Sequence, residues 1–102
     1  MEKGLFNIAS ASTTELIAIH NKTGGISSIN MTNTHDSVAV TVDLFLEDKL
    51  GIKCRIVKTD IPGKTTLLLN DNLTFNNSTL GLKITTSGGG LSTSDYLSVI
   101  IK

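Results

Sequence analysis

The segment VAVTVDLFLE, residues 38–47, determines the fold class, because apolar and polar side chains alternate along most of its length. Every even-numbered position from Val38 to Leu46 is apolar, and successive side chains of an extended strand point to opposite faces. A helix would scatter these positions around its circumference, and the β-branched valines disfavour a helix further. The pattern predicts a strand over residues 38–47, with Phe45 as the one large apolar side chain on its polar face.

Shorter copies of this pattern occur on both sides of the segment, separated by the Gly, Asn, Asp and Pro residues that favour turns. They predict further strands at residues 15–19, 26–31, 52–56, 65–69, 80–85 and 95–101. Short strands at such intervals, with no substantial helix, predict an all-β fold. We expect an antiparallel β-sandwich of about seven to eight strands, either jelly-roll or immunoglobulin-like.

The length of 102 residues is that of one domain, and a second core would not fit. We therefore expect a single sandwich domain over residues 1–102, with residues 1–12 considered as an extended arm.

The composition limits the classes of partner. The 9 basic and 9 acidic residues balance, and aromatic residues make up only 4%, whereas nucleic-acid-binding proteins combine a basic surface with stacking aromatic side chains. No apolar run approaches the roughly 20 residues of a membrane-spanning helix. We expect neither nucleic acid nor a membrane as partner. Charged residues make up 18%, below the average of about 25%, so Ser, Thr and Asn must cover much of the surface.

The residues offer little for catalysis or metal binding. His35, Asp36 and Ser37 have the residue types of a catalytic triad, but neighbouring side chains point apart, and a triad is assembled from separate elements. An active site would require His20 and His35 to meet an acidic side chain in one pocket. No spacing of His, Cys or acidic residues matches a zinc or calcium site. We expect no enzymatic activity and no cofactor.

The single cysteine, Cys54, excludes a disulfide within the chain. In its strand it alternates with Ile52 and Ile56, so we expect a small buried apolar side chain. A reactive thiol between Lys53 and Arg55 is the alternative.

The surfaces of the predicted strands are the remaining candidate for function. Short hydroxyl side chains lose little conformational entropy on burial, which suits static packing against other subunits. The hydroxyl residues predicted on such faces are Ser27, Ser28, Thr41, Thr65, Thr66, Thr85 and Thr86. One basic cluster could contact an acidic partner surface. The candidate interface combines Lys53, Arg55 and Lys58 with Thr41, Thr65 and Thr66.

A series of short motifs covers nearly the whole chain. They are Thr14-Glu15-Leu16-Ile17, Asn21-Lys22-Thr23, Ile29-Asn30-Met31-Thr32-Asn33, Val40-Thr41-Val42-Asp43-Leu44-Phe45-Leu46, Ile61-Pro62-Gly63-Lys64-Thr65-Thr66-Leu67 and Leu80-Gly81-Leu82-Lys83-Ile84. In this order they resemble a family of small virion proteins of tailed bacteriophages, notably phages of marine and photosynthetic bacteria. One position departs from that pattern, because Asn77-Ser78-Thr79 stands where relatives commonly carry Gly-Asp-Ser.

The resemblance implies a virion structural protein, made in the host cytoplasm, that decorates or cements the capsid through contacts with other virion proteins. It also implies a homo-oligomer, with a trimer as one arrangement, and it transfers no catalytic residues. An adaptor or fibre-attachment protein of the tail, neck or baseplate is the first alternative. A carbohydrate-binding sandwich is the second. Such a module usually needs an exposed aromatic platform or calcium, and Tyr96 is the only tyrosine in a chain without tryptophan.

Overall fold

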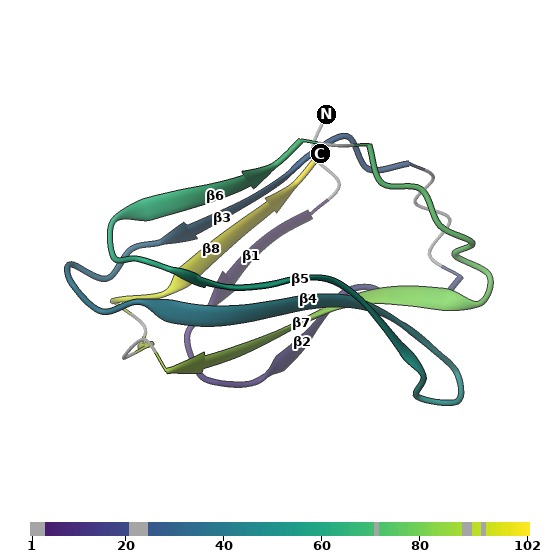
Figure 1. The fold of residues 1–102 in the computed structure, drawn as a ribbon, viewed down its shortest axis with the longest axis horizontal. Helices are drawn as coiled ribbons and strands as arrows, with labels where there is room; N and C mark the ends of the chain where they lie inside the picture. Colours follow the sequence, from purple (N-terminus) through teal and green to yellow (C-terminus); the bar gives the residue numbers. More distant parts are fainter. Residues whose placement is uncertain (1–3, 21–24, 71, 89–90, 93) are drawn as a thin grey trace.

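The computed structural model describes residues 4–20, 25–70, 72–88, 91–92 and 94–102, and the chain folds into two stacked sheets (Figure 1). The strands are β1 (Gly4–Ile8), β2 (Thr13–Ile17), β3 (Ile29–Asn33), β4 (Val40–Asp48), β5 (Lys53–Ile61), β6 (Thr65–Leu69), β7 (Leu80–Gly88) and β8 (Leu97–Ile101). The described residues contain no α-helix, and so none that could cross a membrane. The predicted all-β antiparallel sandwich is confirmed.

The order of the strands distinguishes between the two predicted sandwich types. Sheet 1 has the order β1-β8-β3-β6 and sheet 2 the order β2-β7-β4-β5, and every neighbouring pair is antiparallel. Eight strands split in this way form the two Greek keys of a jelly roll. An immunoglobulin sandwich pairs its strands in a different order. The fold is therefore the jelly roll.

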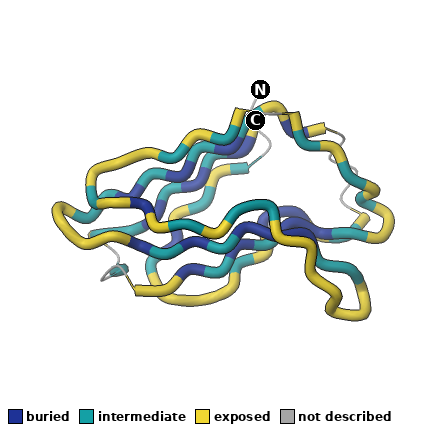
Figure 2. The backbone as a smooth tube through the Cα atoms, in the orientation of Figure 1, coloured by how far each residue is buried: buried dark blue, intermediate teal, exposed yellow. Residues whose placement is uncertain are grey.

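The core lies between the two sheets and follows from the alternation in the sequence. Val40, Val42 and Leu44 of β4 are fully buried on the inner face of sheet 2, and Leu97 and Val99 of β8 are fully buried on the inner face of sheet 1. Figure 2 shows buried positions along the middle of the strands, whereas the loops and the tip of the β4–β5 hairpin are largely exposed. At about 25 cal/mol per Å² of apolar surface removed from water, this burial is the main force that holds the sheets together.

Apart from the strand at residues 65–69, every predicted strand differs from the observed one at one end or both, and β1 was not predicted as a strand. Residues 4–8, inside the stretch considered as an arm, form β1 and pair with β8, whereas residues 1–3 lie outside the described residues. The strand predicted at residues 52–56 extends to Ile61. The predicted start at Val38 is wrong, because β4 begins at Val40 and Val38 is 42% exposed. The Val38 backbone hydrogen-bonds with the side chains of Asn33 and His35, which holds it in the loop.

Phe45 points away from the core and is nevertheless 2% exposed. In the sheet it lies between Arg55 of β5 and Lys83 of β7, and the Lys53 ammonium group lies 4.8 Å from the centre of its ring. Long basic side chains cover apolar surface with their methylene groups and are attracted to an aromatic face. The outward Phe45 is thus buried among basic side chains and not solvated.

The β4–β5 hairpin projects away from the sandwich (Figure 1). Strands β4 and β5 have nine residues each, whereas the strands of sheet 1 have five, so the hairpin extends past the end of sheet 1. Cys54 pairs with Leu46 and shares its face, but it is exposed because no strand of sheet 1 lies over this part of the hairpin. The prediction that Cys54 is buried is therefore wrong. Leu50 and Ile52 near the hairpin tip are 86% and 65% exposed.

Candidate functional site

The outer face of sheet 2 is rich in charge. Its charged residues, placed by the strand register, are Glu15, Asp43, Glu47, Lys53, Arg55, Lys58, Asp60 and Lys83. Acidic and basic residues are equal in number, so the face has no net charge. We call it the charged face.

Two ion pairs organise the charged face. Arg55 donates from Nε and Nη2 to the two carboxylate oxygens of Asp43, at 2.8 and 3.0 Å, and Lys83 Nζ lies 2.6 Å from Glu47 Oε1. The hydrogen bond from Arg55 lowers the pKa of Asp43, and the same bond raises the pKa of Arg55. The hydrogen bond to Glu47 raises the pKa of Lys83. Because the Arg55 side chain is 57% exposed, water screens its pair, and the pair adds little stability.

The outer face of sheet 1 is chemically the opposite. Its strand register forms two rows across the four strands, one with Leu5, Ile100, Asn30 and Leu68 and the other with Asn7, Ser98, Thr32 and Thr66. None of these side chains is charged. Leu5 and Leu68, on the two edge strands, are 61% and 51% exposed. We call these eight residues the uncharged face.

The uncharged face can be buried against another protein at lower free-energy cost than the charged face. Removing ion pairs from water carries a desolvation penalty that their attraction often fails to offset, whereas hydroxyl and amide groups can exchange water for partner hydrogen bonds. The cores of protein interfaces are depleted in charged residues for this reason. Of the two outer faces, the uncharged face is therefore the better candidate for a protein-binding surface.

The structure divides the predicted interface residues between these faces. Lys53, Arg55, Lys58 and Thr41 lie on the charged face, where Thr41 Oγ1 donates to Asp60 Oδ1 at 2.6 Å. The acidic residues around the basic cluster balance its charge, which weakens it as a docking patch for an acidic partner.

The structure places the predicted hydroxyl residues in different environments. Thr66 lies on the uncharged face, and its Oγ1 is 2.8 Å from Thr32 Oγ1. Thr65 lies at the start of β6 and donates to the Gly63 carbonyl at 3.2 Å. Thr86 was predicted on the surface but is 2% exposed, because it points inward and donates to the Ser10 carbonyl at 3.0 Å.

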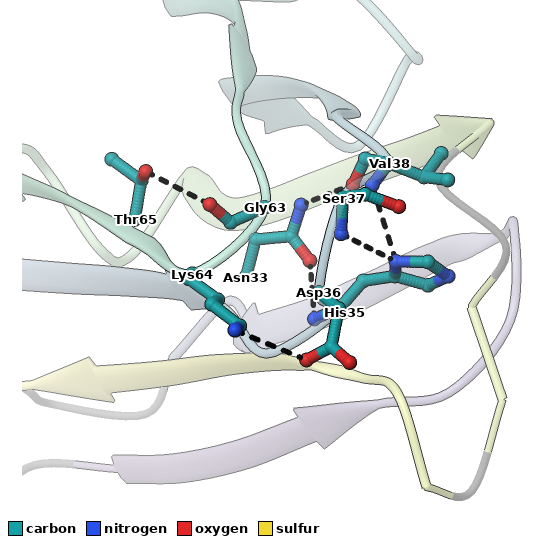
Figure 3. A network of polar contacts seen from close by, with 8 residues as sticks. All are labelled: Asn33, His35, Asp36, Ser37, Val38, Gly63, Lys64 and Thr65. Carbon is teal, nitrogen blue, oxygen red and sulfur yellow. Dashed lines mark hydrogen bonds and ion pairs between the residues drawn. The ribbon is translucent and has the colours of Figure 1, made fainter.

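Asn33 is a buried polar side chain with three hydrogen bonds, and no sequence pattern singled it out (Figure 3). It is fully buried at the end of β3, where its Nδ2 donates to the carbonyls of Val38 and Ile61 at 2.8 and 2.9 Å. Its Oδ1 accepts a hydrogen bond from the His35 amide at 3.1 Å. One side chain thus joins the β3–β4 loop to the end of β5.

The triplet His35-Asp36-Ser37 lies in this loop, and its contacts stabilise the loop and do not form a catalytic triad (Figure 3). His35 Nδ1 accepts hydrogen bonds from the backbone amides of Ser37 and Val38, both at 3.1 Å, so this nitrogen is not available as a base. Asp36 faces Lys64 at 3.7 Å and not the imidazole. The loop packs tightly on the β5–β6 turn, since a Cβ at Gly63 would lie 2.7 Å from the His35 carbonyl oxygen.

His20 lies at the other end of the sandwich, because its amide donates at 2.7 Å to the carbonyl of Asn77, which precedes the β7 residue paired with the far end of β4. The two histidines therefore do not share a pocket. A pocket of about 260 Å³ opens between the sheets, and it is lined by Ile26, Ile29, Ile56, Val57, Leu69, Asn72 and Leu73. It contains no titratable side chain. Within the described ranges, no group of three or more His, Cys, Asp or Glu could hold a metal ion.

A scan against protein-family models finds no match, and searches of curated proteins and of solved structures find no similar protein. Most of the motifs that carry the resemblance to phage virion proteins lie on strands, from Thr14–Ile17 on β2 to Leu80–Ile84 on β7. Residues 21–23 lie outside the described residues.

Proposed function

We propose that this chain is a virion structural protein without enzymatic activity, and that it binds its neighbours through the uncharged face. The observation that carries the proposal is the contrast between the two outer faces of one sandwich. One face has no charged residue, and the other has eight. A protein solvated on all sides would gain nothing from this segregation, because charges on both faces would favour solubility.

The fold and the sequence resemblance favour a phage particle as the place of action. Eight-stranded jelly rolls are common in viral capsid proteins, although lectins and cupins share the fold, so the fold alone selects no function. Together with the resemblance to small phage virion proteins, it favours a capsid decoration or cement protein. An adaptor or fibre-attachment protein of the tail, neck or baseplate is the alternative. Copies spread over the capsid would indicate decoration, and a few copies at one position would indicate the tail.

The size of the uncharged face bears on the mechanism. Four strands of five residues, about 4.8 Å apart and about 3.4 Å per residue, span roughly 300 Å². A stable protein complex buries about 800 Å² on each partner. One copy would therefore bind weakly through this face alone. A homo-oligomer that bridges neighbouring capsid subunits, as a trimer or another assembly, would combine several such contacts and resist internal pressure.

A carbohydrate-binding function has weaker support. The fold is shared with lectins, but Phe45 is buried and the side chains of Phe6, Phe75 and Tyr96 are half-buried. None of them forms the exposed platform on which a sugar ring stacks. Binding in a glycan screen would favour this function over the virion role.

Heating of purified particles tests the cement role. Particles from which the chain has been removed are expected to release their genome at a lower temperature than complete particles, because the bridging contacts are lost. Adding the purified chain back should restore the original temperature. Equal release temperatures with and without the chain would contradict the cement role.

A further inference from the structure

The four edge strands of the sandwich differ in their protection against pairing with other strands. Natural edge strands are usually blunted by charged side chains, proline or β-bulges. In sheet 2, β5 carries Lys53, Arg55 and Lys58 and has a bulge at Ile56, and β2 carries Glu15 and a bulge after it. Both edges of sheet 2 are thus protected.

Strand β6, at one edge of sheet 1, has none of these devices. Its residues, Thr65–Leu69, include no charge and no proline, and they pair with β3 in an uninterrupted register. Among the described residues, no backbone hydrogen bond from outside the sheet reaches this strand. Strand β1, at the other edge, is also uncharged, but it contains Gly4 and Asn7, residue types that are depleted in strands. The residues of β6 therefore favour strand addition more than those of β1.

An apolar surface continues from β6 to the neighbouring edge of sheet 2. The 260 Å³ pocket lies between the edge strands β6 and β5, with Leu69 on one side and Ile56 and Val57 on the other. Leu68, on the outer side of β6, is 51% exposed. A second molecule beside β6 would remove both the mouth of this pocket and Leu68 from water.

We propose that β6 pairs with β6 of a second copy of this chain across a two-fold axis, so that two copies of sheet 1 form one continuous sheet. A two-fold axis makes the pairing antiparallel and self-complementary. With the axis at Leu67, this residue lies opposite its own copy, and Thr66 lies opposite Leu68 of the second copy. The two uncharged faces then join into one surface of roughly 600 Å², close to the size of a standard interface.

Charge substitutions on β6 test the dimer by sedimentation of the purified chain. The unmodified chain is expected to sediment as a dimer. The double variant Thr66→Lys, Leu68→Lys is expected to be a monomer, because each lysine faces a lysine of the second copy. The variant Thr66→Glu, Leu68→Glu should also be a monomer. An equimolar mixture of the two variants should form heterodimers, because every introduced lysine then faces a glutamate.

A matched control places the same charges on the opposite edge of the same sheet. The variant Leu5→Lys, Asn7→Lys is expected to remain a dimer. Cooperative thermal unfolding, followed by circular dichroism, would show that each variant is folded. A monomeric unmodified chain, a mixture that stays monomeric, or a control that dissociates would each overturn the proposal. If the unmodified chain were a trimer, and the substitutions on β6 and those on β1 disrupted it equally, β1 would pair head-to-tail with β6 and the proposal would be wrong.

Cross-linking tests the register. In a Cys54→Ser background, Leu67→Cys is expected to oxidise to a disulfide-linked dimer, because directly opposed residues of antiparallel strands have the Cα separation that a disulfide requires. Leu5→Cys in the same background should stay monomeric on denaturing gels. Efficient cross-linking at position 5 and none at position 67 would refute the pairing. These measurements use the isolated chain, so their outcome is independent of whether the uncharged face binds a particle.

Discussion

Replacing Asn33 by alanine is expected to lower the free energy of unfolding by about 3 kcal/mol, a large part of the roughly 5–15 kcal/mol that stabilises a domain. The fully buried amide makes three hydrogen bonds, to the backbone of His35, Val38 and Ile61. The alanine variant leaves these backbone groups without their partner in a site closed to water. Each such group costs about 1–3 kcal/mol unless the loop opens to let water in. Denaturant unfolding measures the effect.

Asn30→Ala is the matched control for this prediction. Asn30 is on the same strand, but its side chain points to the outer face and is half-buried. Its removal is expected to change the stability by less than about 0.5 kcal/mol. Equal effects of the two substitutions would contradict the structural role of Asn33.

Replacing Ser98 by glutamate is expected to weaken binding to the particle by about 3 kcal/mol, roughly a hundredfold loss of affinity. Ser98 is on β8, one of the two central strands of sheet 1, and points to the middle of the uncharged face. A carboxylate there would have to lose its water on docking without gaining a partner charge. Binding of the purified variant to particles stripped of the chain, measured by co-sedimentation, gives the affinity.

Ser87→Glu introduces the same charge on the outer side of sheet 2. Ser87 is exposed on β7, opposite Thr41 of β4, where charged neighbours are already present. This variant should bind as tightly as the unmodified chain. If Ser87→Glu lost binding and Ser98→Glu retained it, the docking surface would be the charged face.

The strands could be predicted from the sequence because alternation is a local property. The predicted strand at residues 65–69 coincides with β6, and the inward positions of β4 are those of the even-numbered apolar residues. The order of the strands could not be predicted in the same way. Pairings such as β1 with β8 join residues from the two ends of the chain, and no local pattern specifies them. The jelly-roll and immunoglobulin-like alternatives therefore stayed open until the structure separated them.

Apart from Thr66, the residues of the uncharged face were missed for the same reason. Leu5, Asn30 and Ile100 become neighbours only when three strands from distant parts of the chain are set side by side. The error at Cys54 and the burial of Phe45, whose face was predicted correctly, have a related cause. Alternation assigns each side chain to a face, but whether that face is covered depends on strand length and on long side chains from neighbouring strands. Asn33 carried one usable signal, because an amide at the end of a strand can hydrogen-bond the backbone of the loop that follows.

A reconstruction of the intact virion that resolves this chain tests the central claim most directly. The account predicts that the outer side of sheet 1, with Asn30, Ser98 and Ile100 at its centre, lies in contact with neighbouring virion proteins. Lys58 and Lys83 on sheet 2 should face solvent. A chain that contacts the capsid through the charged face, with Leu5 and Leu68 exposed to solvent, would contradict the account. A virion that does not contain the chain would also contradict it.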